Sequence, residues 1–207
     1  MSEMDRREAV RLLGAASLAV AFPWSPAEVD RAARATRSAL AARAAGEAFE
    51  PKFFTAHEWE TARVLADLIL PRDERSGSAT DAGVPEFMDF ILTDTTLGDR
   101  SGAQTWMRGG LAWLDTECRE RFGKAFVECA DPERTAVLDD VAWPDKAPAG
   151  LSHGVTFFNR FRDLTASGFW SSRIGVEDLR YTGNVPVQEW KGCPEAQLRK
   201  LGVRYDE

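Results

Sequence analysis

Apolar residues recur at helical spacing along most of this 207-residue chain, and this periodicity limits the possible folds more than any other feature. In the segment that follows Thr55, for example, Trp59, Leu65 and Ile69 recur at the spacing of a helix. No segment alternates apolar and polar residues over the length of a half-buried strand. The sequence therefore predicts an all-α fold, an irregular helical bundle of about five or six helices with a long irregular C-terminal tail.

Residues that favour helix ends set the expected boundaries. Thr55 with Glu58 three residues later is a capping-box pattern, and Pro71 ends that helix before a polar loop, Arg72–Gly83. Asp131-Pro132 combines an N-cap residue with proline at the first helical position. The further helices expected are one that opens at Pro85, Gln104–Phe122, Asp131 to before Pro144, Leu151–Ser167 and a short stretch near Pro194–Leu201.

The first 21 residues have the composition of an export signal. Arg6 and Arg7 form a twin-arginine pair, and the chain is apolar or small from Leu12 to Phe22. That stretch is shorter than the about 20 residues of a membrane span. Ala19-Val20-Ala21 supplies a small-x-small cleavage site. The pattern predicts a Tat-type signal peptide over residues 1–21 and a periplasmic protein that is exported folded; the alternative is an amphipathic N-terminal helix.

The remaining chain divides into two parts, and the second ends in a distinct tail. Residues 22–52 are rich in Ala and Arg, with few large apolar residues, and are expected to form a linker or an exposed helix. Residues 53–207 are expected to form one helical domain. Its last part, 168–207, is rich in Gly, Pro and large aromatic residues, and loops of this kind are typical of interfaces. We therefore interpret 168–207 as a partner-binding tail, with a wrap around the chain's own core as the alternative.

Several kinds of chemistry are excluded or disfavoured by the residues present. A net charge of −7 disfavours a broad nucleic-acid surface. With 2 His and 3 Cys, a four-ligand Cys/His zinc site cannot be built without carboxylates. The sequence holds no haem-attachment run, nucleophile elbow or phosphate-binding loop. His57 and His153 each lie in the first turn of an expected helix, where capping or surface roles are more common than catalysis. No catalytic, cofactor-binding or metal-binding residue is predicted in this chain.

Cysteine and glycine add two narrower expectations. In an oxidising periplasm the three cysteines allow one disulfide and leave one thiol, and their positions in the sequence do not select the pair. Gly109-Gly110 interrupts the longest expected helix at a cost of about 1 kcal/mol per glycine, which indicates close packing of that backbone against a neighbour.

Three segments carry a resemblance to a known family. They are Phe53–Leu92, which includes SGSATDAGVPEF, Gly110–Phe126 (GLAWLDTECRERFGKAF) and Gly168–Pro194 (GFWSSRIGVEDLRYTGNVPVQEWKGCP). They resemble the gluconate 2-dehydrogenase subunit 3 family over nearly all of residues 53–203. Members are small Tat-exported subunits of periplasmic FAD-dependent sugar dehydrogenases. The segments IGVEDLRYTGN and WKGCP are most similar to small subunits that accompany glycoside 3-dehydrogenases.

The resemblance implies a non-catalytic role. In that family the FAD and the catalytic residues belong to a separate large subunit of the GMC oxidoreductase type, and electrons pass to a c-type cytochrome that holds haem c. The small subunit stabilises the large one and carries it through the Tat channel. The resemblance thus implies a GMC-type partner, no cofactor in this chain, no nucleic-acid partner, and membrane association only through the signal or the complex.

The resemblance also implies particular residues. We expect the tail to contact the large subunit, with the Asp73–Gly83 loop nearby, and we expect a Cys118–Cys193 disulfide because both cysteines fall in matching segments. Two rival functions remain: a free-standing periplasmic sugar-modifying enzyme that uses Asp/Glu pairs, and a self-contained helical binding module. The residues expected to contact the partner are Trp170, Arg173, Tyr181, Asn184 and Trp190.

Overall fold

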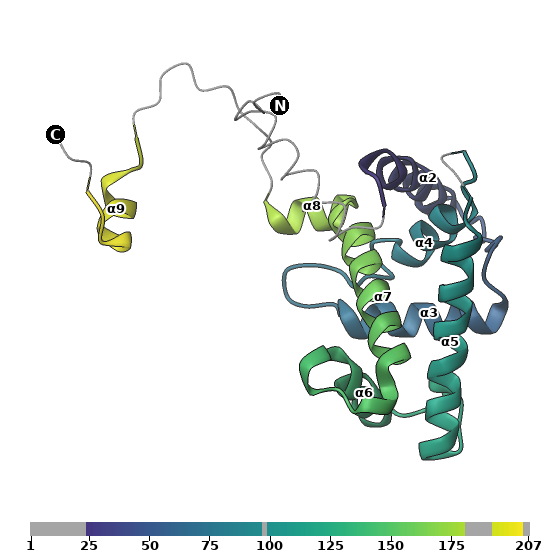
Figure 1. Cartoon of the computed structure of the whole chain (residues 1–207). Coiled ribbons are helices and arrows are strands. Elements are labelled where there is room, and N and C mark those ends of the chain that lie inside the picture. Colours follow the sequence, from purple (N-terminus) through teal and green to yellow (C-terminus); the bar gives the residue numbers. More distant parts are fainter. Residues whose placement is uncertain (1–23, 97–98, 181–191, 205–207) are drawn as a thin grey trace, which may run out of the picture.

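The chain folds into helices throughout the part that can be described. The computed structural model describes residues 24–96, 99–180 and 192–204, and within these ranges it contains eight α-helices, three short 3₁₀ helices and no strand. The predicted all-α class is confirmed. The helices (Figure 1) are α2 Pro26–Ala44, α3 Ala56–Ile69, α4 Val84–Thr93, α5 Ser101–Phe122, η1 Phe126–Glu128, α6 Asp131–Ala142, η2 Pro144–Lys146, η3 Ala149–Leu151, α7 Ser152–Trp170, α8 Arg173–Leu179 and α9 Glu195–Leu201.

Local capping explains where several of these helices begin. At α3 the Thr55 hydroxyl accepts a hydrogen bond from the Glu58 amide, and the Glu58 carboxylate accepts one from the Thr55 amide at 2.8 Å, as the capping-box pattern predicts. At α6 the expected N-cap is displaced by one residue. Ala130 occupies the cap, and the Glu133 carboxylate accepts a hydrogen bond from its amide at 2.7 Å. Glu133 therefore binds the amide of the cap residue itself, and the side-chain cap expected of Asp131 is absent.

Helix α7 is the central element of the core. It contacts every other α-helix from α2 to α8, and Figure 1 shows it running from α6 at its start to α8 at its end. Phe161 of α7 and Phe126 of η1 are fully buried. Phe87 of α4 is almost fully buried in the same cluster. These rings fill the space between α3, α4, α5 and α7, so the aromatic content of the body is mainly core material.

The paired glycines of α5 have different environments. A Cβ atom on Gly110 would lie 1.7 Å from Cδ2 of Phe157 on α7, whereas a Cβ atom on Gly109 would have no neighbour within 4 Å. The predicted close packing is therefore present at Gly110 and absent at Gly109. A second glycine, Gly154 of α7, makes a similar close contact from the opposite helix. A Cβ atom on Gly154 would lie 2.3 Å from the Trp113 ring of α5. Small residues thus allow α5 and α7 to approach closely.

The Ala/Arg-rich segment packs more closely than its composition suggests. It forms α2, which lies against α4, and Ala32, Ala33 and Thr36 are buried there. Trp24, just before the helix, is only 7% exposed. Large apolar residues are not needed at this contact, since alanines let two helix backbones come close together. Of the two forms expected for this segment, a linker or an exposed helix, it takes the helix, and three residues of that helix are buried.

The predicted irregular tail begins later and contains more helix than expected. Residues 168–170 continue α7, and α8 follows directly, while α9 matches the short helical stretch expected near Pro194–Leu201. The signal peptide, residues 1–21, lies outside the described residues. Among the described residues there is no disulfide, so the expected Cys118–Cys193 bond is not formed in this structure.

Candidate interaction surface

Two segments that are far apart in the sequence meet beside α8. A guanidinium nitrogen of Arg75, in the polar loop between α3 and α4, lies 2.7 Å from a carboxylate oxygen of Asp178 in α8. The same guanidinium donates a hydrogen bond to the Asp178 carbonyl oxygen at 2.9 Å, across 103 residues of sequence. The loop and the tail were each expected to lie near a partner subunit, and the structure places them side by side.

Apolar side chains are exposed on the same part of the molecule. Trp170 ends α7 with 37% of its surface exposed, and Val176 and Leu179 of α8 are 38% and 56% exposed. Trp170 packs edge-on against the buried ring of Phe169, with ring centroids 4.9 Å apart. We call the surface formed by Arg75, Trp170, Arg173, Val176 and Leu179 the α8 face. Exposed apolar residues gathered between charged ones are typical of protein interaction sites.

The α8 face is held rigidly by the junction between α7 and α8. The Ser172 hydroxyl accepts a hydrogen bond from the Gly175 amide at 3.0 Å and donates one to the Phe169 carbonyl at 2.6 Å. A Cβ atom on Gly175 would lie only 2.1 Å from the Phe169 carbonyl oxygen, so α8 crosses the end of α7 in backbone contact. Arg180, with a positive φ of 53°, ends α8 in the left-handed conformation. The direction of α8 is therefore set by short-range contacts.

The predicted partner residues divide between described and undescribed parts of the chain. Trp170 and Arg173 both lie on the α8 face, and the Arg173 side chain is 84% exposed, with Glu177 3.7 Å away as an ion-pair partner. Tyr181, Asn184 and Trp190 lie outside the described residues, as do Arg6 and Arg7. Sequence reasoning missed Val176 and Leu179. Their spacing of three residues within GVEDL was the available signal.

The acidic residues of the polar loop hold its shape. The Asp73 carboxylate accepts hydrogen bonds from the amides of Ser76 and Arg75, and these bonds hold the pKa of Asp73 below its usual value. Asp81 accepts from the Ser78 amide at 2.7 Å and pairs with Arg72 at 2.6 Å. Within the described residues no group of three or more His, Cys, Asp or Glu side chains is arranged to hold a metal ion.

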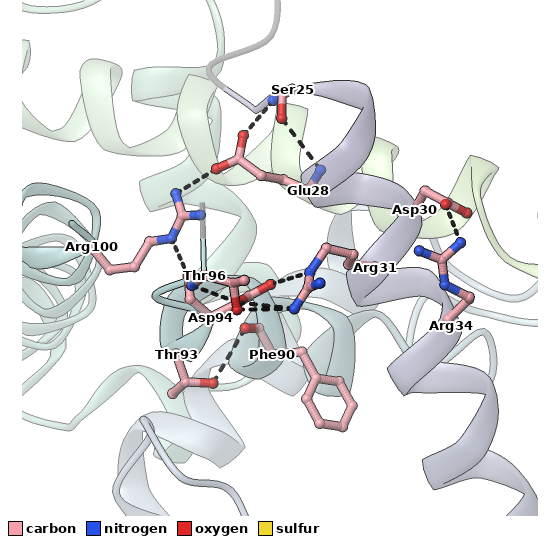
Figure 2. Close-up of polar contacts among 10 residues, drawn as sticks. All are labelled: Ser25, Glu28, Asp30, Arg31, Arg34, Phe90, Thr93, Asp94, Thr96 and Arg100. Atoms are coloured by element: carbon pink, nitrogen blue, oxygen red, sulfur yellow. Dashed lines mark hydrogen bonds and ion pairs between the residues drawn. The ribbon is translucent and has the colours of Figure 1, made fainter. Parts of the chain in front are cut away.

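A network of ion pairs attaches α2 to the body (Figure 2). Arg100, just before α5, pairs with Glu28 of α2 at 2.5 Å and donates to the carbonyl oxygen of Asp94 at 2.7 Å. Arg31 of α2 pairs with the Asp94 carboxylate at 2.8 Å and donates to the Thr96 hydroxyl at 3.0 Å. The hydrogen bond from Arg31 holds the pKa of Asp94 far below its usual range, with help from Thr96. The Arg100–Glu28 pair is largely shielded from water, with 8% and 11% of the two side chains exposed.

The two histidines lie in separate settings. The Nε2 atom of His57 is 2.5 Å from a carboxylate oxygen of Asp115, and the other oxygen of Asp115 accepts a hydrogen bond from the Phe126 amide at 3.0 Å. This arrangement joins α3, α5 and η1, which is a structural role. His153 is exposed at the start of α7. The structure does not bring the two histidines into one site.

No helix in the described ranges is both long enough and apolar enough to cross a membrane.

Comparison with known proteins gives one match. A family model described as gluconate 2-dehydrogenase subunit 3 matches residues 56–192, which is 137 of 207 residues. The match begins at α3 and includes both segments that form the α8 face, and it leaves out α2. No curated protein and no solved structure matches the chain.

Proposed function

The chain belongs to the gluconate 2-dehydrogenase subunit 3 family, and we propose that it is the non-catalytic small subunit of a periplasmic FAD-dependent sugar dehydrogenase. In this proposal the FAD and the catalytic residues lie in a GMC-type large subunit, which this chain stabilises. Electrons leave the flavin for a c-type cytochrome. The substrate is gluconate or a glycoside that is oxidised at C3. No catalytic step is assigned to residues of this chain.

The observation that best supports a partner subunit is the α8 face. Its exposed Trp170, Val176 and Leu179 would lose contact with water in a complex, and each buried apolar side chain would favour association. Arg173 extends from the same face and is suited to pair with a carboxylate of the large subunit. Because the α7–α8 junction and the Arg75–Asp178 pair already fix the backbone of α8, little backbone conformational entropy would be lost on binding.

The second part of the proposal is co-export. A Tat-type signal at Arg6 and Arg7 addresses a folded protein, and a partner bound to this chain would travel with it. The attachment of α2 to the body supports this role. The ion pairs Glu28–Arg100 and Arg31–Asp94 fasten the helix that follows the signal to the domain that would carry the partner.

Co-export can be tested by inactivating the export signal. We expect co-expression with a GMC-type flavoprotein encoded beside this chain to deliver a yellow complex of both chains to the periplasm. Replacing Arg6 and Arg7 with Lys should leave both chains in the cytoplasm while the complex still forms. Flavin fluorescence and immunoblots of the two fractions measure this. Sugar turnover by the isolated chain, or export of the flavoprotein without it, would overturn the proposal.

The α8 face can be tested with two tryptophans that are both exposed. We expect Trp170→Ala to weaken binding of the flavoprotein by roughly 30-fold, the effect of losing one interface hot spot. Trp143 is the matched control, because it is 63% exposed, follows α6 and rests beside Lys146. Trp143→Ala should leave the dissociation constant unchanged. An unchanged dissociation constant for Trp170→Ala, with an unchanged melting temperature, would exclude Trp170 of the α8 face as a contact.

A further inference from the structure

A cavity of about 380 Å³ lies between α5 and α7, and it shares no residue with the α8 face. From α5 it is lined by two tryptophans and the two glycines between them, Trp106, Gly109, Gly110 and Trp113. From α7 it is lined by residues at the same helical spacing, His153, Thr156, Phe157 and Arg160. Its volume falls within the range of small-molecule sites in proteins, about 300–1,000 Å³.

The cavity is open because Gly109 has no side chain. A Cβ atom there would meet nothing within 4 Å, although glycine inside a helix is less favourable than alanine. Close packing against α7 explains Gly110 and does not explain Gly109. Space between Trp106 and Trp113, which are two helical turns apart, is therefore what Gly109 provides.

The two tryptophans are held by α7 and remain partly exposed. The ring of Trp113 lies against Gly154, where a Cβ atom would be only 2.3 Å away. The centroid of the Trp106 ring is 6.2 Å from that of Phe157, which is 5% exposed. Aromatic walls that are already ordered lose little freedom when a ligand binds.

The positive charge beside this cavity has no partner among the described residues. The Arg160 side chain makes no hydrogen bond or ion pair with them, and none of the residues that line the cavity is acidic. The other four arginines of α5 and α7 all pair with carboxylates; they are Arg108, Arg119, Arg121 and Arg162. Because a guanidinium binds a carboxylate through two parallel hydrogen bonds, Arg160 favours an anionic ligand.

Two further side chains of α7 can bind hydroxyl groups. The Thr156 hydroxyl donates to the Ser152 carbonyl oxygen at 3.0 Å, so its own oxygen can still accept a hydrogen bond. His153 is exposed, and its ring has no partner in the described part of the chain, so the neutral ring offers one donor and one acceptor. A ligand with an apolar face, hydroxyl groups and a carboxylate would use all of these groups.

We propose that this cavity binds a sugar acid in its pyranose form, such as a hexuronate. The C–H face of the pyranose ring packs on the indoles of α5, because both surfaces are apolar. The ring hydroxyls bind Thr156 and His153, and the carboxylate pairs with Arg160. This inference goes beyond the proposed function and does not rest on it, because every residue that lines the cavity belongs to this chain.

The test titrates the full purified chain, without a flavoprotein, with methyl glucuronide, methyl glucoside and benzoate. We expect methyl glucuronide to bind roughly 10-fold more tightly than methyl glucoside, which lacks the carboxylate, and than benzoate, which lacks the hydroxyl groups. Calorimetry gives the dissociation constants, and saturation-transfer NMR should show contact at the ring C–H protons of the glucuronide. No binding of methyl glucuronide, or equal or tighter binding of either other probe, would overturn the proposal.

Two pairs of variants test whether binding takes place in the cavity. Gly109→Leu fills the open space and should abolish binding without lowering the melting temperature, whereas Gly102→Leu, in an equally open position of α5 outside the cavity, should bind normally. Arg160→Gln should weaken binding of methyl glucuronide roughly 10-fold and leave that of methyl glucoside unchanged. Arg162→Gln, on the same helix outside the cavity, should change neither. Normal binding by Gly109→Leu, or equal losses in Arg160→Gln and Arg162→Gln, would exclude this site.

Discussion

Replacing Gly110 with Ala is expected to destabilise the bundle by about 3 kcal/mol, near the upper end of overpacking effects in protein cores. The added methyl group would lie 1.7 Å from a ring carbon of Phe157, in the contact between α5 and α7. Phe157 is 5% exposed and also packs against the ring of Phe161, so it cannot move aside freely. The two helices would have to separate, and the contacts of α7 with the rest of the core would weaken.

Gly109 is the matched control for this prediction. It lies one position earlier on the same helix, and a Cβ atom there has no neighbour within 4 Å. Gly109→Ala should leave stability unchanged or raise it by up to about 1 kcal/mol, because alanine favours helix more than glycine does. Urea unfolding of the three proteins, followed by circular dichroism, gives the comparison. Equal midpoints for the two variants would show that α5 and α7 do not approach at Gly110.

Replacing Asp89 with Asn is expected to cost about 3 kcal/mol, since charge-assisted hydrogen bonds are lost inside the core. Asp89 of α4 is fully buried, and its carboxylate accepts hydrogen bonds from the amides of Lys52, Phe53 and Phe54, at 2.8 Å from Phe53. An asparagine side chain keeps one acceptor oxygen and presents an N–H group to a backbone donor. The segment that leads into α3 would then lose part of its attachment to α4.

The control for Asp89 is an aspartate with a similar backbone contact at the surface. Asp99 accepts a hydrogen bond from the Ser101 amide at 3.0 Å in an exposed setting. Asp99→Asn should change the free energy of unfolding by less than about 0.5 kcal/mol, as is usual for surface substitutions. Urea unfolding measures both variants, and limited proteolysis between residues 50 and 55 should become faster only in Asp89→Asn. A small loss of stability in Asp89→Asn would mean that the amides of Lys52, Phe53 and Phe54 find other hydrogen-bond acceptors.

The helices that could be predicted are those whose large apolar residues and caps agree. Helix α3, with its capping box, is the example, and the helix expected at Gln104–Phe122 is also confirmed within a few residues as α5. The packing of α2 could not be predicted in the same way, because it depends on alanines and on ion pairs with Asp94 and Arg100, far along the chain. Helix α8 was not predicted, because it lies in a segment whose Gly, Pro and large aromatic residues are typical of irregular structure.

The candidate interaction surface was predictable only in part. Trp170 and Arg173 were identified because large aromatic and Arg residues in a glycine-rich segment are typical of interfaces. The contact between Arg75 and Asp178 has no local signal, since neither residue is unusual among its neighbours in the sequence.

The Arg75–Asp178 pair also bears on when the α8 face comes into existence during folding. The contact spans half of the chain, so it cannot form on a nascent chain until α8 has been synthesised and has folded onto α7. A chain that ends before α8 lacks this surface. A protein that recognises the α8 face would therefore bind chains that have completed folding in preference to those that have not.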